Sequence, residues 1–213
     1  KSSADAAQAA KDAADHVQEK ITEGSFGFFA SVGADDALEV LNSDKIHQGT
    51  GVALSSYTQK GDEDDATSLK NMKKAKTWLH SYNELRENLG LSEVKVTDRL
   101  MAIAQVDANY SNTHFGHAGT YNVGENAAWN YGSNPYLQWY YQEKGSYDHS
   151  RMEPTDDPGY LLKGQEDLCK KNYEKGASTV MSPFHYYAIL EDYDFTGFAV
   201  CSRKSDDSVL KGG

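Results

Sequence analysis

Two helical patterns in the middle of the chain limit its fold most strongly. Between Thr67 and Leu89, apolar side chains recur on one helical face, and Gly90 follows as a C-terminal cap. After a short connection, Thr97 is typical of the N-cap of a second helix that continues to about Tyr110. The two patterns predict a pair of long helices with buried faces, against which the rest of the chain must pack.

Two apolar runs nearer the C-terminus predict β-strands. Residues Phe184 to Leu190 and Phe195 to Ser202 have strand-like composition, and the polar residues between them suit the turn of an antiparallel hairpin. Residues 126–130 could add a third strand, and residues 135–143 a further helix. These elements predict an α+β fold in which helices pack on a small, mainly antiparallel sheet.

The beginning of the chain has a different character. Residues 1–21 are rich in alanine and repeat apolar side chains on one helical face, which predicts a helix that buries little surface and serves as a stalk or linker. Residues 34–42 predict a short helix in an otherwise irregular region. We interpret residues 1–65 as an N-terminal extension, 66–204 as the main domain and 205–213 as a C-terminal tail.

Charge and composition exclude several classes of function. With 32 acidic and 21 basic residues the net charge is −11, so the chain repels polyanions and offers no basic surface to nucleic acid. No apolar run reaches the roughly 20 residues of a membrane-spanning helix. The chain lacks a P-loop and the short motifs of serine hydrolases and thermolysin-like peptidases, and we expect no organic cofactor.

Three other features bear on export. The chain starts at Lys1 without a methionine or an apolar signal core, which suits a chain whose export signal has been removed. Cys169 and Cys201 are too few and too far apart for a metal knuckle, and they can form either one disulfide or a reduced pair. Asn109-Tyr-Ser111 is formally a glycosylation acceptor, but it lies on a predicted helix.

Several motifs rich in histidine, glutamate and aromatic residues follow one another along the chain. They are Ser81-Tyr82-Asn83-Glu84-Leu85-Arg86 with Gly90-Leu91, His117, Gly124-Glu125-Asn126 with Ala128-Trp129, Glu143-Lys144 with Tyr147-Asp148, His185-Tyr186, and Gly197-Phe198-Ala199-Val200.

In these motifs and their order, the chain from about Lys70 to Arg203 resembles the CAP superfamily of cysteine-rich secretory proteins, antigen 5 venom proteins and plant pathogenesis-related type 1 proteins, in a bacterial-type form. The resemblance implies an α-β-α sandwich and a secreted or cell-surface location. Departures from the family pattern surround the motifs: Tyr82 replaces a histidine, Ala118 a serine, and Tyr187-Ala188 a threonine and a glutamine.

The resemblance also implies a functional site. It places His117, Glu125, Glu143 and His185 around one cleft, with direct hydrogen bonds between glutamate and imidazole. His117 and His185 are then the potential ligands of a weakly held divalent cation such as Zn²⁺, because neutral imidazoles bind such ions through one ring nitrogen each. The glutamates would orient the rings or exchange protons.

We therefore interpret the chain as a secreted binding or interaction module whose cleft takes a small hydrophobic ligand such as a lipid or sterol, a glycan, or a protein. Four tyrosines could line a groove for such a partner, or several of them belong to the core: Tyr136, Tyr140, Tyr141 and Tyr160. Two alternatives are a divalent-metal-dependent, peptidase-like hydrolase that uses the His/Glu cluster, and a structural cell-surface or spore-coat domain with a vestigial cleft.

Overall fold

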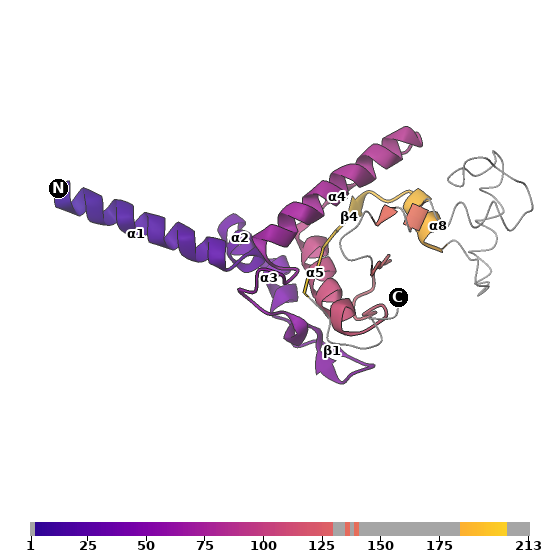
Figure 1. The fold of residues 1–213 in the computed structure, drawn as a ribbon, viewed down its shortest axis with the longest axis horizontal. Helices are drawn as coiled ribbons and strands as arrows, with labels where there is room; N and C mark the ends of the chain where they lie inside the picture. Colours follow the sequence, from indigo (N-terminus) through magenta and orange to yellow (C-terminus); the bar gives the residue numbers. More distant parts are fainter. Residues whose placement is uncertain (1–2, 130–134, 137–138, 141–183, 204–213) are drawn as a thin grey trace, which may run out of the picture. The chain divides into compact units, whose positions relative to one another are not determined.

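The computed structural model describes residues 3–129, 135–136, 139–140 and 184–203 of the chain (Figure 1). The contacts between its residues divide it into two compact units. Unit 1 comprises residues 1–79, 95–123 and 195–213. Unit 2 comprises residues 80–94 and 124–194.

The chain begins with the predicted alanine-rich helix, α1, which spans Ser3–Thr22. Its side chains are exposed along almost the whole length, including Val17 and Ile21 on its apolar face. Two shorter helices follow in unit 1: α2 spans Ser25–Val32 and α3 spans Asp35–Leu41. The sequence prediction of helices at residues 1–21 and 34–42 is therefore confirmed.

A small antiparallel strand pair follows α3 in unit 1. Strand β1 (Ile46–His47) pairs with β2 (Val52–Ala53), so that His47 lies opposite Val52. The 3-10 helix η1 (Leu54–Tyr57) follows β2, and its Leu54 is only 1% exposed.

Helix α4 spans Leu69–Asn88 and confirms the first long helical pattern. It ends as the sequence predicts, because Gly90 has a φ of 73°, in the left-handed region that glycine tolerates best. The N–H groups of Gly90 and Leu91 donate to the carbonyls of Glu87 and Arg86, at 2.9 Å each. This pair of hydrogen bonds is a Schellman motif, which satisfies carbonyls at the end of the helix.

Helix α5 spans Asp98–Thr113, and Thr97 caps it, because the Thr97 Oγ1 accepts a hydrogen bond from the N–H of Leu100 at 3.2 Å. The helix is buried on more than one face. It packs against α3 and η1 of the same unit (Figure 1). The shared core is made of apolar side chains from two segments of unit 1, residues 1–79 and 95–123: Phe29, Ala34, Ala37, Val40, Leu41, Leu54, Ala102, Ile103, Val106, Tyr110 and Ala118.

The predicted C-terminal hairpin is wrong. Residues Phe184–Leu190 form a helix, α8, and the short strand β4 (Phe195–Thr196) pairs in parallel with β3 (Lys95–Val96). A seven-residue apolar run fits either a buried strand or a buried helix, and periodicity alone does not separate the two. In α8, Tyr186, Tyr187 and Ile189 are buried, as a helix with neighbours on more than one side requires.

The other two predicted elements have mixed outcomes. Residues 126–129 form no strand in the structure. The described residues between 135 and 140 are helical, and the N–H of Trp139 donates to the carbonyl of Pro135 at 3.0 Å. Helices combined with short strand pairs and a helical N-terminal region make the fold α+β, as predicted. The predicted domain boundary at residue 66 stays a prediction.

Candidate functional site

The centre of unit 2 is a buried arginine near the end of α4. Arg86 has no exposed surface. Its Nε donates to the carbonyl of Ser92 at 2.7 Å, and its Nη1 donates to the carbonyls of Ile189 and Glu191 at 3.0 and 2.9 Å. Within the described part of the chain, Nη2 has no hydrogen-bond acceptor.

These contacts make Arg86 the cap of helix α8. The last carbonyls of a helix lack partners within the helix, and they carry the negative end of its dipole. The guanidinium supplies both donors and positive charge to that end, at Ile189 and just beyond it at Glu191. Arg86 therefore fixes the position of α8 within unit 2.

A group of aromatic rings packs around this clamp. Tyr82 stacks on Tyr136 with ring centroids 5.7 Å apart, and Tyr136 meets the edge of Trp139 at the same distance. The Trp139 Nε1–H donates to the carbonyl of Ala127 at 3.0 Å, which ties the segment after the Gly-Glu-Asn motif to these rings. The Tyr82 hydroxyl lies 3.4 Å from the carbonyl of Ile189, which it donates to.

The expectation that Tyr136 and Tyr140 line a groove is wrong, because each is only 3% exposed. Tyr141 and Tyr160 lie outside the described residues. Burial raises the pKa of the Tyr82 hydroxyl above its ordinary value, although the charge of Arg86 opposes the shift. Burial also raises the pKa of Tyr136, strongly. Tyr136, Trp139 and Tyr140 therefore belong to the buried interior of unit 2.

Two of the four predicted site residues lie in unit 2, on segments that contact each other. Glu125 and His185 are both half-buried. His185 is the second residue of α8, and the side-chain amide of Asn126 donates to its carbonyl at 3.4 Å. The Gly-Glu-Asn motif thus meets the first turn of α8, while Arg86 holds the other end.

The other two predicted residues are placed differently. His117 is exposed and lies in unit 1, on the loop that follows α5. Glu143 lies outside the described residues. The convergence of all four side chains on one cleft, with hydrogen bonds between glutamate and imidazole, therefore stays a prediction. Among residues 3–129 and the other described segments, no group of three or more His, Cys, Asp or Glu side chains is placed to hold a metal ion.

The structure describes Cys201 and Asn109, two of the residues that bear on export. Cys201 is a half-buried free thiol, and because Cys169 lies outside the described residues, the choice between a disulfide and a reduced pair stays open. Burial raises the pKa of the Cys201 thiol. Asn109 is fully buried, and its amide nitrogen donates to Thr58 and Asp65, so the folded protein does not present it for glycosylation.

The sequence places Arg86 in a motif, but no role was predicted for it. A signal for that role was present, because Arg86 follows Tyr82 by four residues and therefore shares its helical face. A charged residue on the apolar face of a helix requires buried partners. The sequence could not show that these partners are carbonyls more than a hundred residues away in the chain.

No described helix combines the length and the apolar character that crossing a membrane requires. Comparison with curated proteins and with solved structures gave no match. The sequence model of the cysteine-rich secretory protein family, CAP, matches residues 79–210, which is more than half of the chain. The match covers Arg86, the Gly-Glu-Asn motif and the helix of His185. The chain therefore belongs to the CAP family of cysteine-rich secretory proteins.

Proposed function

We propose that this CAP protein is an extracellular binding module, and that His117, Glu125, Glu143 and His185 form its functional site. The partner is a small hydrophobic ligand, a glycan or a protein. Family membership supports the extracellular location, and the same membership supports the four residues as one site.

One observation carries the proposal: the two motifs that provide Glu125 and His185 are held together inside unit 2. The Asn126 amide binds the carbonyl of His185, and Arg86 binds the carbonyls at the other end of the same helix. A binding site needs side chains whose orientation is fixed before the partner arrives, because fixing them on binding costs affinity. Contacts at both ends of α8 hold the backbone that carries His185, which supports this proposal.

The chemistry of the proposed residues suits a divalent cation such as Zn²⁺, because imidazole and carboxylate are both ligands that it accepts. His117 and His185 would hold the ion, and the glutamates would accept hydrogen bonds from the rings. When bound, the ion would supply a Lewis acid for a polar group of the partner. Without the ion, the same imidazoles and carboxylates bind polar groups by hydrogen bonds alone.

The site is tested by calorimetric titration with Zn²⁺. We expect the native chain to bind the ion, and the double variant His117→Ala/His185→Ala to give no heat above dilution. His80→Ala serves as the matched control, because His80 is an exposed histidine on α4 that belongs to the same unit as His185. Equal heats for the native chain and the double variant would contradict a site shared by the two histidines.

A second measurement separates binding from catalysis. The native chain and the double variant are incubated with a mixed peptide substrate in the presence of Zn²⁺, and new amino groups are counted. We expect no difference between them, as a binding module requires. Zinc-dependent cleavage by the native chain that the double variant lacks would overturn the module and establish the peptidase-like hydrolase.

A further inference from the structure

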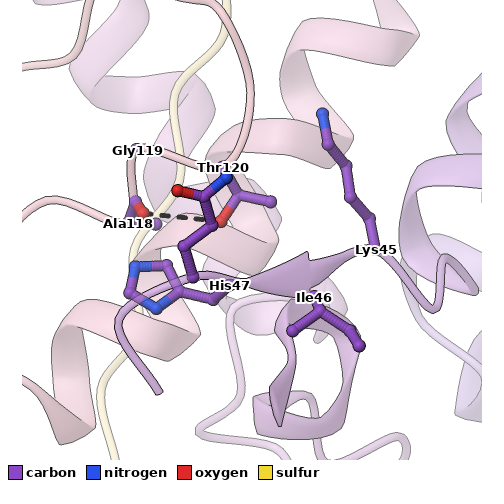
Figure 2. A pocket seen from close by; sticks show the side chains of 7 residues that line it. Lys45, Ile46, His47, Ala118, Gly119 and Thr120 are labelled. Carbon is purple, nitrogen blue, oxygen red and sulfur yellow. Dashed lines mark hydrogen bonds between the residues drawn. The ribbon is translucent and has the colours of Figure 1, made fainter. Parts of the chain in front are cut away.

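A cavity in unit 1 involves residues that the family match does not cover, whereas the Arg86 clamp belongs to unit 2. Its volume is about 230 Å³, and it is formed between the region of β1 and the loop that carries His117 (Figure 2). The lining residues are Lys45, Ile46, His47, Gln48, Ala118, Gly119 and Thr120. Because the matched family region begins at residue 79, the β1 wall of this cavity is a feature of this chain's N-terminal part.

Three side chains of the β1 wall carry hydrogen-bond donors. Lys45 contributes an ammonium group, His47 an imidazole and Gln48 an amide, whereas none of the lining residues is acidic. Lysine has donors only, and a neutral imidazole or an amide offers at least one donor. None of the lining residues carries a negative charge, although the net charge of the chain is −11, and the Lys45 ammonium gives this wall a positive charge.

The two charged or titratable side chains are held in place by aromatic rings. The Lys45 Nζ lies 4.5 Å from the centroid of the Tyr121 ring, and no described carboxylate forms an ion pair with it. The His47 ring packs against Tyr110 with centroids 4.5 Å apart, and Tyr110 stacks on His114 at 4.6 Å. Packing that restricts a donor before binding lowers the entropy cost of the contact.

The loop on the other side of the cavity brings the backbone close to any occupant. Gly119 has a φ of 59°, in the left-handed region, where a side chain would be strained. Figure 2 shows Thr120 on this wall, with its hydroxyl bonded to the carbonyl of Ala118 at 3.4 Å. The small side chains at 118 and 119 leave the cavity open on this side.

From this arrangement we infer that the cavity binds a small oxyanion, either a phosphate or a carboxylate group. Such groups accept hydrogen bonds and are bound most strongly by charged donors such as the Lys45 ammonium. A bare divalent cation is disfavoured, because the lining offers one imidazole and no carboxylate. The volume is below the roughly 300 Å³ at which pockets for drug-sized ligands begin, so the occupant is a small molecule or a terminal group of a larger one.

The inference is tested by amide NMR of the whole chain during titration with inorganic phosphate and, separately, with acetate at constant ionic strength. We expect the amide signals of Gly119 and Thr120 to shift and saturate with at least one of the two anions, with a dissociation constant on the order of 1 mM. The anion that binds more tightly identifies the group that the cavity takes. Shifts that grow linearly without saturation for both anions would overturn the inference.

Variants distinguish this site from general charge effects. Lys45→Glu and His47→Leu should each weaken binding by about tenfold or more, because each removes a donor that the packing holds in place. Lys73→Glu is the matched control, since Lys73 is an exposed lysine of α4 in the same unit and the change in net charge is identical. Equal weakening by Lys45→Glu and Lys73→Glu would contradict a localised site. This outcome is independent of the zinc titration, which concerns other residues.

Discussion

The two units each bury an arginine, and they satisfy it in different ways. In unit 1, Arg203 lies beside a carboxylate: its Nη1 is 3.8 Å from Asp65 Oδ2, and its Nη2 donates to the carbonyl of Tyr57 at 2.8 Å. In unit 2, Arg86 binds three backbone carbonyls, and among the described residues no carboxylate pairs with it. One arginine therefore depends on a particular side chain, and the other on the course of the backbone.

Asp65 of unit 1 binds several other groups besides Arg203. The carboxylate has no exposed surface. It accepts hydrogen bonds from the N–H of Gln59 at 2.7 Å, from the N–H and hydroxyl of Thr67 at 2.8 and 2.7 Å, and from the amide of Asn109 at 3.0 Å. This single group joins the segment before α4, the buried helix α5 and the C-terminal segment.

The two arrangements should differ in how well they tolerate substitutions. A network of side chains loses several hydrogen bonds when one member changes, because the remaining buried groups have no other partners. A clamp on carbonyls is insensitive to the identity of the residues that supply them. Unit 1 should therefore be sensitive at several positions, whereas unit 2 should be sensitive at Arg86 but not at the residues that it contacts.

The largest effect is expected for Asp65→Ala. Removal of the carboxylate takes away the only described ion pair of Arg203 and the acceptor of four hydrogen bonds in the protein interior. The breaking of a buried charge pair in this way costs about 3–5 kcal/mol, and we expect the free energy of unfolding to fall by that amount. Urea denaturation followed by tryptophan fluorescence measures the change.

Glu63→Ala is the control for Asp65→Ala. Glu63 is an exposed carboxylate two residues earlier, and its only described ion pair is with Lys70 at 3.9 Å. An exposed pair of this kind contributes little, so the free energy of unfolding should change by less than about 0.5 kcal/mol. If Asp65→Ala were as mild as Glu63→Ala, unit 1 would not depend on its buried carboxylate.

The next effect is expected for Arg86→Ala, which leaves the carbonyls of Ser92, Ile189 and Glu191 without a donor. We expect a loss of about 2–4 kcal/mol, from about 1 kcal/mol or more for each hydrogen bond to a charged group. Arg86→Lys keeps the charge but not the planar fork, so it should recover only part of the loss. Hydrogen exchange should show the amides of α8 exchanging faster in both variants.

Glu191→Ala tests the claim that Arg86 binds the backbone of residue 191 and not its side chain. The substitution keeps the carbonyl to which Nη1 donates, so the free energy of unfolding should stay within about 0.5 kcal/mol of the native value. A large loss for Glu191→Ala would mean that the clamp also depends on side chains. The comparison between the two units would then no longer hold.

The parts of the fold that the sequence predicts well are those with local signals. The Schellman end of α4 at Gly90 and the cap of α5 at Thr97 involve residues within a few positions of each other. The C-terminal run from Phe184 to Leu190 has no such signal, and the contact at its end comes from the distant Arg86. Local chemistry therefore identified helix ends, while no local signal separated helix from strand in this run.

The same distinction applies to the candidate site. The motif order identified the family and the segments that carry Glu125 and His185. The contact of Asn126 with the carbonyl of His185 joins residues 59 positions apart, and no local pattern indicates it. No local pattern indicates the cavity beside His47 either, because its two walls, residues 45–48 and 118–120, are far apart in the sequence.

The smallest effect concerns pH and the tyrosines beside Arg86. Burial raises the pKa of Tyr82 and Tyr136 above the ordinary value of 10.0, so the folded protein favours their neutral forms. A group whose pKa is raised by folding contributes stability that is fully present below pH 10 and is lost as pH rises through the folded-state value. At pH 8, Tyr82→Phe should cost about 1 kcal/mol, because it removes two long hydrogen bonds, one donated to the carbonyl of Ile189 at 3.4 Å and one accepted from Arg86 Nη1 at 3.5 Å. Above pH 10 the same variant should lose stability less steeply than the native chain, because phenylalanine has no proton to release.

Tyr136→Phe should show the same flattening of the alkaline loss of stability, and Tyr193→Phe, at a side chain that is 45% exposed, should not. Denaturation curves across this alkaline range decide the matter: parallel loss in the native chain and in both buried variants would mean that ionisation of these tyrosines does not open unit 2.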